Sequence, residues 1–273
     1  MEGGGRSVKL FVKLGGSFIT DKSAVETLHA KNVVLAAKAI RAALEEARAA
    51  GKRMSLVLSH GAGSFGHIHA KRYDATKGIH PQYGWEAYYR IRDSMARMSL
   101  LFIRHCNEGG LFPVAIQPSA IAEANDGAVT RLDVRPMKAL LGFGQIPVIP
   151  GDIIPDAKRG FTIASTESLL KSVAQELRFD RIVMVSDTDG VLDNDGSTIP
   201  WIDPRAISQV LSFLRGSKSP DVTGGMRKKV ECLYDLVSSG KAGSARIIGG
   251  VGDLDNLKAA LLGTGGGGTI VGG

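Results

Sequence analysis

Short apolar runs alternate with longer stretches whose apolar residues recur every three or four positions. The short runs predict buried strands, and the longer periodic stretches predict helices that bury one face. The predicted strands are residues 8–14, 54–59, 112–117, 146–150, 181–186, 245–248 and 269–271. The predicted helices are residues 33–47, 85–107, 166–177 and 225–238.

Strands that alternate with helices indicate an α/β fold, a three-layer α/β/α sandwich with a largely parallel central sheet. We expect one contiguous sheet in one continuous domain. A flexible tail, residues 1–7, precedes two lobes, residues 8–180 and 181–273. The glycine run at 265–268 predicts a tight turn before the last strand.

The 273 residues are 44% hydrophobic and 22% charged, which is an ordinary globular composition. The net charge of +7 suits an anionic ligand, or simply keeps the protein soluble. The scattered basic residues lack a nucleic-acid recognition module, and no run of 18 apolar residues predicts a membrane span. Cys106 and Cys232 lie far apart in apolar helical contexts, so we expect buried thiols and a cytoplasmic protein.

The first predicted strand ends in a glycine-rich turn, Gly15-Gly16-Ser17. Consecutive glycines let backbone N–H groups surround an anion, because no Cβ atom intervenes. Lys13 precedes the turn and Lys22 follows it, so both lysines suit a phosphoryl group in transfer. A plain turn between a strand and a helix is the alternative explanation.

The second predicted strand also ends in a glycine-rich turn, residues 59–67, with the sequence Ser-His-Gly-Ala-Gly-Ser-Phe-Gly-His. This turn is neither a dinucleotide fingerprint nor a Walker A loop. Its backbone N–H groups suit a second phosphate, and His67 can donate a hydrogen bond to a phosphate oxygen. A structural role for His67 is the alternative. The two turns together predict one site for ATP and a small phosphorylated acceptor.

Two later segments also place charged residues beside turns. Asp187 and Asp189 follow a buried strand, and ligands bind at the carboxyl ends of strands in open α/β sheets. These carboxylates suit a ribose or the water shell of Mg²⁺, or they cap their own turn. Gly224 and Gly225 precede a helix that carries Lys229 about one turn from its start, which predicts a third anion site.

The four segments together resemble the amino acid kinase family, and the resemblance covers essentially the whole chain. The matching motifs are K-x-G-G-S at 13–17, H-G-x-G at 60–63, S-D-x-D-G-V at 186–191 and G-G-M-x-x-K at 224–229. The resemblance implies the family's fold, ATP and Mg²⁺ as cofactors, no direct side-chain ligand to the metal, and a homodimer.

Within this family, residues 19–22, 63–67 and 150–152 resemble the isopentenyl phosphate kinases. Those enzymes convert isopentenyl phosphate and ATP to isopentenyl diphosphate and ADP in isoprenoid biosynthesis, on an alternative mevalonate route. The resemblance implies an acceptor site in residues 8–180, a nucleotide site in residues 181–273, and direct in-line transfer. It assigns catalysis to Lys13, Lys22 and His67, ATP binding to Lys13, Gly15, Gly16, Ser17, Gly63, Asp187, Gly225 and Lys229, and acceptor binding to Ala62, His67, Gly151 and Asp152. The prenyl tail of such an acceptor needs an apolar pocket, which we expect in the region after His67, with Tyr73 and Ile79 on the loop as its favoured residues.

One residue departs from the family pattern. The family's acidic segment before the mid-chain helix reads Ser-Thr-Glu-Ser here, so Glu167 would stand where an aspartate orders the active-site lysines. A glutamate reaches about one methylene further than an aspartate.

Three other functions remain open. A fosfomycin-type kinase would share the histidine-containing loop and phosphorylate a phosphonate. An acetylglutamate-type kinase needs an arginine for the acceptor's carboxylate, and the sequence offers no clear candidate. A non-catalytic protein of the same fold would store or sense an anion, but the presence of Lys13, Lys22 and Lys229 argues against it.

Overall fold

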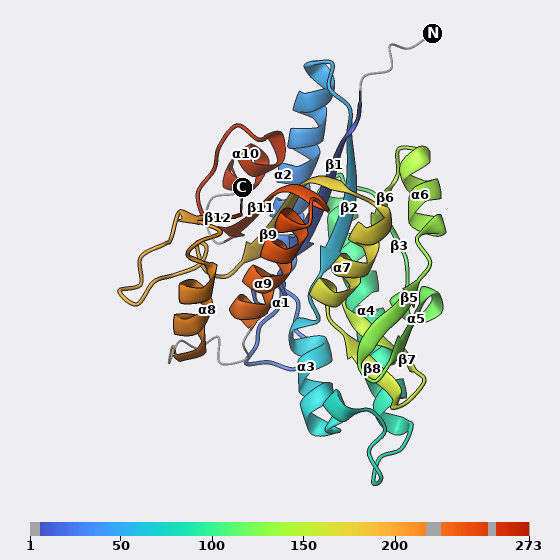
Figure 1. The fold of residues 1–273 in the computed structure, drawn as a ribbon. Helices are drawn as coiled ribbons and strands as arrows, with labels where there is room; N and C mark the ends of the chain where they lie inside the picture. Colours follow the sequence, from blue (N-terminus) through green and yellow to red (C-terminus); the bar gives the residue numbers. More distant parts are fainter. Residues whose placement is uncertain (1–5, 217–224, 251–254, 273) are drawn as a thin grey trace.

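The computed structural model describes residues 6–216, 225–250 and 255–272. Residues 1–5 of the predicted tail, and residues 221–224 ahead of the predicted helix at 225, lie outside this part of the chain. Helices cover both faces of a central sheet, as Figure 1 shows. The prediction of an α/β/α sandwich with a mostly parallel sheet is therefore confirmed.

Eight strands form the central sheet within the described residues, in the order β10-β12-β11-β9-β1-β2-β6-β3. All neighbouring strands are parallel except β11 and β12. The strands are β1 (Val8–Leu14), β2 (Met54–His60), β3 (Pro113–Ala115), β6 (Ile146–Val148), β9 (Phe179–Ser186), β10 (Trp201–Ile202), β11 (Ala242–Gly249) and β12 (Thr269–Val271).

Successive residues of the central strands point to opposite faces of the sheet, because the side-chain period of a strand is two. Leu10 and Val12 of β1 pack into one core, and Phe11 packs into the other. The first core lies under α2 (Ala30–Ala49), α4 (Glu86–Glu108) and α10 (Asp255–Leu262), and the second under α7 (Thr166–Glu176), α8 (Ile207–Gly216) and α9 (Gly225–Ser238). Lys13 shares the face of Phe11, which directs its side chain towards α7.

A second sheet was not predicted. Four strands form it in the described chain, in the order β5-β4-β7-β8. They are β4 (Ala122–Asn125), β5 (Ala128–Leu132), β7 (Asp152–Asp156) and β8 (Gly160–Ala164). The expectation of one contiguous sheet is therefore wrong. Asp126 and Gly127 both have positive φ and join β4 to β5. An Asp-Gly pair is a known signal of a β-hairpin, so this dipeptide could have revealed these two strands.

The remaining helices are short and connect the strands. They are α1 (Gly16–Ile19), α3 (Gly63–Arg72), the 3₁₀ turn η1 (Ala75–Lys77), α5 (Pro118–Ile121) and α6 (Arg135–Gly142). Helices α1 and α3 begin in the two glycine-rich turns and therefore position the site. No helix in the described ranges is both long and apolar enough to cross a membrane.

Candidate active site

The carboxyl ends of three adjacent parallel strands bring the glycine-rich turns together. Strand β1 lies between β2 and β9, with Leu14 opposite His60 on one side and Val185 on the other. The Gly15 N–H donates to the Val185 carbonyl at 2.8 Å, and the Gly61 N–H donates to the Leu14 carbonyl at 3.0 Å. Both turns therefore leave the sheet at the same edge, as the motifs predicted.

The two turns touch each other through their backbones. A Cβ atom on Gly16 would lie 2.6 Å from the Gly63 nitrogen, and one on Gly15 would lie 2.5 Å from the Val185 carbonyl oxygen. Glycine is therefore required at both positions of the first turn. Helices α1 and α3 begin at Gly16 and Gly63, and the first N–H groups of a helix have no partner within it. The N–H groups of Ser64 and Gly66 donate to the Thr20 hydroxyl and the Ala62 carbonyl, so an anion would bind to the remaining ones.

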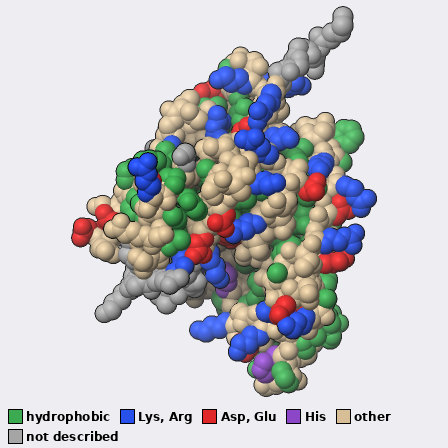
Figure 2. Space-filling view, in the orientation of Figure 1, with side chains coloured by type: hydrophobic (Ala, Val, Ile, Leu, Met, Phe, Trp, Pro, Cys, Tyr) green, Lys and Arg blue, Asp and Glu red, His purple; other side chains and the backbone are tan. Residues whose placement is uncertain are grey.

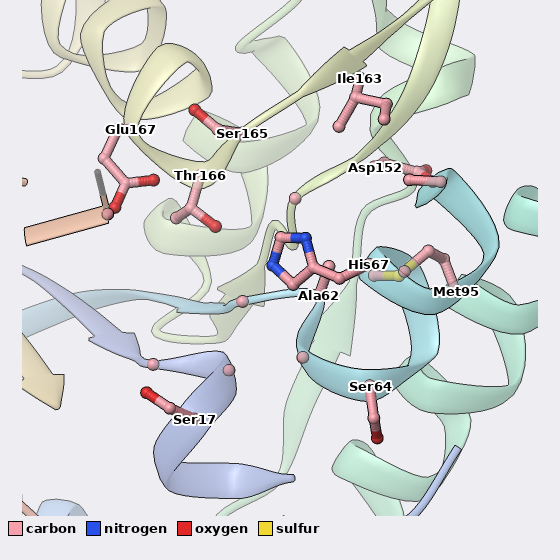
Figure 3. A pocket seen from close by; sticks show the side chains of 18 of the residues that line it. Ser17, Ala62, Ser64, His67, Met95, Asp152, Ile163, Ser165, Thr166 and Glu167 are labelled. Carbon is pink, nitrogen blue, oxygen red and sulfur yellow. The ribbon is translucent and has the colours of Figure 1, made fainter. Parts of the chain in front are cut away.

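A cavity of about 420 Å³ opens where the turns meet. Figure 3 shows His67 and Thr166 within it, with Ser17 and Ser64 on the side of the two turns. In the space-filling view, basic and acidic side chains lie around a hollow that contains histidine (Figure 2). The predicted site residues that line the cavity are Lys13, Gly15, Gly16, Ser17, Lys22, Ala62, Gly63, His67, Gly151, Asp152, Glu167, Gly225 and Lys229.

Glu167 forms a buried ion pair with Lys13. The Lys13 Nζ atom contacts the Glu167 carboxylate, and the two side chains are 7% and 15% exposed. Burial raises the pKa of the Glu167 carboxyl, but the charge and hydrogen bond of Lys13 outweigh burial and lower it overall. The extra methylene of glutamate therefore does not prevent the contact with Lys13. The charge of Lys229 also lowers the pKa of Glu167, and Lys229 Nζ donates to the Ser186 hydroxyl at 3.2 Å.

His67 lies on α3 and points into the cavity (Figure 3). Burial is the main cause that lowers the pKa of its imidazole, and the positive charges of Lys22 and Lys13 lower it further. The ring is therefore neutral near pH 7, so it carries one N–H donor and one acceptor nitrogen. A neutral ring beside lysines can hydrogen-bond an anion without adding charge.

Lys22, which lines the cavity, forms an ion pair with Asp187. Their Nζ and Oδ2 atoms are 3.8 Å apart, and the side chains are 57% and 45% exposed. Burial raises the pKa of the Asp187 carboxyl, but a hydrogen bond from Ser17 and the charge of Lys22 lower it overall. Asp187 does not line the cavity itself, but it contacts two residues that do.

The far end of the cavity is apolar. Helices α3 and α4 supply Ile68, Ala70, Ile91 and Met95, and β8 supplies Ile163. Ile163 was missed because β8 was not predicted.

Tyr73 and Ile79, which were expected around the acceptor's tail, do not line this cavity. Tyr73 is buried in the core with its ring against Tyr83, at 5.2 Å between centroids. Ile79 is 41% exposed and lies beside Gly160. The loop that follows α3 folds away from the cavity. The position of this loop in the sequence, directly after His67, did not indicate that direction.

Gly151 and Asp152, which were also predicted to bind the acceptor, form part of the cavity wall. The Gly151 N–H donates to the His60 carbonyl at 3.2 Å. The Asp152 side chain is fully buried, and its Oδ1 atom accepts from Arg92 Nη1 at 2.7 Å. Burial raises the pKa of the Asp152 carboxyl, and the charge of Arg92 opposes that effect. Helix α4 therefore holds one oxygen of this carboxylate, while its buried Oδ2 atom has no hydrogen-bond partner among the described residues.

Ser64, Thr166 and Lys228 also line the cavity, although the sequence did not single them out. Thr166 follows the cap residue of α7, and its hydroxyl donates to the His60 carbonyl at 3.3 Å. Lys228 directly precedes Lys229 at the start of α9. A search for polar residues at helix starts near the glycine-rich turns would have found all three.

Comparisons with known proteins agree with this geometry. The sequence model of the amino acid kinase family matches residues 9–249. The chain therefore belongs to the amino acid kinase family. It is 34% identical to the isopentenyl phosphate kinase of Methanocaldococcus jannaschii over 92% of this chain and 94% of that protein. It is 36% identical to the isopentenyl phosphate kinase of Haloferax volcanii, over 82% of this chain and 87% of that protein.

Solved structures give the same result. An X-ray structure of isopentenyl phosphate kinase superposes with a TM-score of 0.78 at 25% identity, covering 96% of this chain and all of that one. Carbamate kinase from Giardia lamblia, bound to AMP-PNP, superposes with a TM-score of 0.63 at 14% identity, covering 97% of this chain and 98% of that one. The second likeness concerns the fold alone.

Proposed function

We propose that this protein transfers the γ-phosphoryl group of ATP to isopentenyl phosphate, forming isopentenyl diphosphate and ADP. One observation carries the proposal: a single cavity joins a cationic, glycine-lined end to an apolar end. Such a cavity fits an acceptor that has a phosphate head and a short hydrocarbon tail. The relatives named above support the same acceptor, because isopentenyl phosphate is the substrate in their names.

We assign the ATP phosphates to the side of the cavity where the two glycine-rich turns meet α9. The backbones of Gly15, Gly16 and Gly63 leave no room for a Cβ atom but can bring N–H groups close to phosphate oxygens. Lys13 and Lys229 both supply positive charge, and both lower the pKa of the Glu167 carboxyl. Residues 181–273 would hold the rest of the nucleotide, with Asp187 near it.

We assign the acceptor's phosphate to His67 and the neighbouring N–H groups of α3. Ala62 and Gly151 form the wall beside it, and the prenyl tail would lie between Met95 and Ile163. A neutral His67 donates one hydrogen bond to a phosphate oxygen, which requires no proton transfer.

The transfer itself forms one bond and breaks one. An oxygen of the acceptor phosphate attacks the γ-phosphorus in line, and the bond from that phosphorus to the β,γ-bridging oxygen breaks, releasing ADP. The acceptor phosphate needs no strong general base, because its second pKa is about 6. The main barrier is repulsion between two anions, which Lys13, Lys22 and the backbone N–H groups reduce.

Magnesium would accompany ATP and neutralise charge on its phosphates. Among the described residues, no three His, Cys, Asp or Glu side chains are grouped to hold a metal ion. Asp187 is half-exposed and pairs with Lys22, so it suits a contact through metal-bound water. The metal would therefore bind chiefly through the phosphates of ATP.

A panel of acceptors tests the proposal. ADP release would be measured with ATP and Mg²⁺ in the presence of isopentenyl phosphate, fosfomycin or N-acetylglutamate. We expect a clear preference for isopentenyl phosphate. Preference for fosfomycin would identify a phosphonate kinase, and tight anion binding without turnover of any acceptor would identify a storage protein. Either result would refute the proposal.

We also propose a homodimer formed at the β3 edge of the central sheet. Phe112 and Phe143 are 69% and 81% exposed near this edge, and Leu100 on α4 is 62% exposed. Pro113 lacks an N–H donor, so we expect packing of side chains rather than pairing of strands. Sedimentation of the wild type and a Phe112→Glu, Phe143→Glu variant tests this: the variant should be monomeric.

The cytoplasm is the compartment we propose. Both cysteines, Cys106 and Cys232, are buried free thiols, as is usual in a reducing compartment. Localisation of the tagged protein in its native cell would test this assignment.

A further inference from the structure

Lys22 lies on an exposed loop, residues 20–29, between α1 and α2. Thr20 and Leu28 form an isolated antiparallel bridge, and the Asp21 N–H donates to the Thr27 carbonyl at 3.0 Å. Lys22 therefore projects from the tip of a narrow hairpin-like loop. A charge that stabilises a transferring phosphoryl group must be held in place, because small misplacements reduce the rate sharply.

The base of this loop is fastened to both glycine-rich turns. The Thr20 hydroxyl donates to the Gly16 carbonyl at 2.7 Å and accepts from the Ser64 N–H at 3.0 Å. The Thr27 N–H donates to the Ser64 hydroxyl at 3.2 Å. These contacts hold the ends of the loop but not the segment that follows Lys22.

Glu26 supplies the missing attachment. Its Oε1 atom accepts from His69 Nε2 at 2.8 Å, and its two oxygens accept from Arg97 Nη2 at 2.8 and 3.0 Å. Burial raises the pKa of the Glu26 carboxyl, but hydrogen bonds from Arg97, Ser94 and His69 lower it overall. The carboxylate is thus charged and held from two helices, α3 and α4.

The backbone of Glu26 is strained in a way that favours this attachment. Its φ is +49°, in the left-handed region that residues other than glycine rarely adopt. Such conformations persist where surrounding contacts determine them, and they cluster at functional sites. In this conformation the Glu26 side chain is bound by His69 and Arg97.

We infer that Glu26 is a positioning residue, which fixes the Lys22 loop against the helix that carries His67. His67 and His69 lie two residues apart on α3, so one carboxylate joins the loop of the transfer lysine to the helix of the acceptor's histidine. This inference rests on the proposed function, because it takes Lys22 and His67 as parts of the site. Glu26 itself does not line the cavity.

Glu26→Gly is the sharpest variant, because it removes the whole side chain with its carboxylate, and glycine adopts φ +49° without strain. We expect kcat with isopentenyl phosphate to fall by about 10- to 100-fold, the range for a misplaced catalytic group, while the KM for ATP and the denaturation midpoint change little. Glu86→Gln is the matched control: Glu86 is an exposed partner of Arg90 on α4, and its loss should leave kcat unchanged.

A double-mutant cycle with Lys22→Ala separates positioning from general stability. If Glu26 acts through Lys22, the Glu26→Gly, Lys22→Ala variant should have the same kcat as Lys22→Ala alone. The inference would be overturned if Glu26→Gly lowered kcat by the same factor in the wild type and in Lys22→Ala. An unchanged kcat in Glu26→Gly would overturn it as well. Should Glu26→Gly lower the denaturation midpoint, the same cycle run with Glu26→Gln decides the question.

Hydrogen exchange provides a readout that does not depend on turnover. The N–H groups of Asp21 and Thr27 should exchange faster in Glu26→Gly, while the N–H groups of β1 and β2 stay protected. Unchanged exchange at Asp21 and Thr27 would overturn the inference even if no acceptor were turned over. Inactivity of the wild type towards isopentenyl phosphate would instead refute the proposed function.

Discussion

A Cβ atom on Gly61 would lie 2.6 Å from the backbone nitrogen of Gly16. No side chain can occupy either position without moving a glycine-rich turn, because the atom in the way belongs to the backbone. The close approach fixes the distance between the two turns, and so between the two phosphate sites that we assign to them.

Gly61→Ala should therefore disturb both stability and turnover. We expect the free energy of unfolding to fall by about 1–3 kcal/mol, as for other overpacked sites, with a larger relative loss of kcat. Gly142→Ala is the control: a Cβ atom there meets nothing within 4 Å, and alanine is the better helix former. Denaturant unfolding and steady-state kinetics measure both. Normal activity in Gly61→Ala would contradict the backbone contact.

His67→Ala should reduce turnover of isopentenyl phosphate severely while ATP binding survives. The neutral imidazole is proposed to donate to the acceptor's phosphate and takes no part in holding the nucleotide. The test compares kcat/KM for the acceptor with the Kd for an ATP analogue. His67→Asn retains an N–H donor and should keep more activity than alanine does. Near-normal turnover in His67→Ala would remove this residue from the site.

Glu167→Gln should destabilise the protein and slow the reaction. The substitution keeps the shape but leaves the Lys13 ammonium buried beside a neutral amide. Removing one partner of a buried pair costs about 3–5 kcal/mol. Glu167→Asp, which keeps the charge on a shorter side chain, should lose less. Equal stability of the wild type and Glu167→Gln in denaturant unfolding would mean that this ion pair contributes nothing.

His60 should make the protein sensitive to acid. Its ring is fully buried, and burial lowers its pKa to about 4 from the ordinary 6.5. The Gly61 carbonyl can only accept, so Nδ1 carries the proton at 3.1 Å from that oxygen, and Nε2 accepts from the Ser99 hydroxyl at 3.2 Å. Protonation would break this arrangement.

The sign follows from proton uptake. Below pH 6.5 the unfolded chain binds a proton at His60 that the folded protein refuses until about pH 4, so acid favours unfolding. The stability lost through this group is about 2 kcal/mol between pH 7 and pH 5. Denaturant unfolding across this range measures it. His60→Gln should show a shallower dependence, and parallel curves for the two proteins would contradict the prediction.

Much of the site could be predicted from the sequence because strand ends determine it. Lys13, Gly15 and Gly63 meet because adjacent parallel strands end at one edge of a sheet. The position of each residue just before or just after the end of its strand is then sufficient to place it in the site.

Other parts of the site depend on packing that no short pattern encodes. Ile163 reaches the cavity only because β8 belongs to a second sheet, and Tyr73 leaves it because the chain turns into the core after α3. No sequence motif pointed to Glu26, because its partners, His69 and Arg97, lie on two separate helices. In each case the decisive contact lies far along the chain.

The cavity's two ends come from different stretches of the chain. Its apolar wall is built from Ile68, Ala70, Ile91, Met95 and Ile163, whereas Gly225 and Lys229 lie on helix α9, much further along the chain. Selection can therefore alter the tail-binding wall while the phosphate-transfer machinery stays intact. A lineage with this fold could acquire new acceptors by a few substitutions in α3, α4 and β8, without having to evolve phosphoryl transfer again.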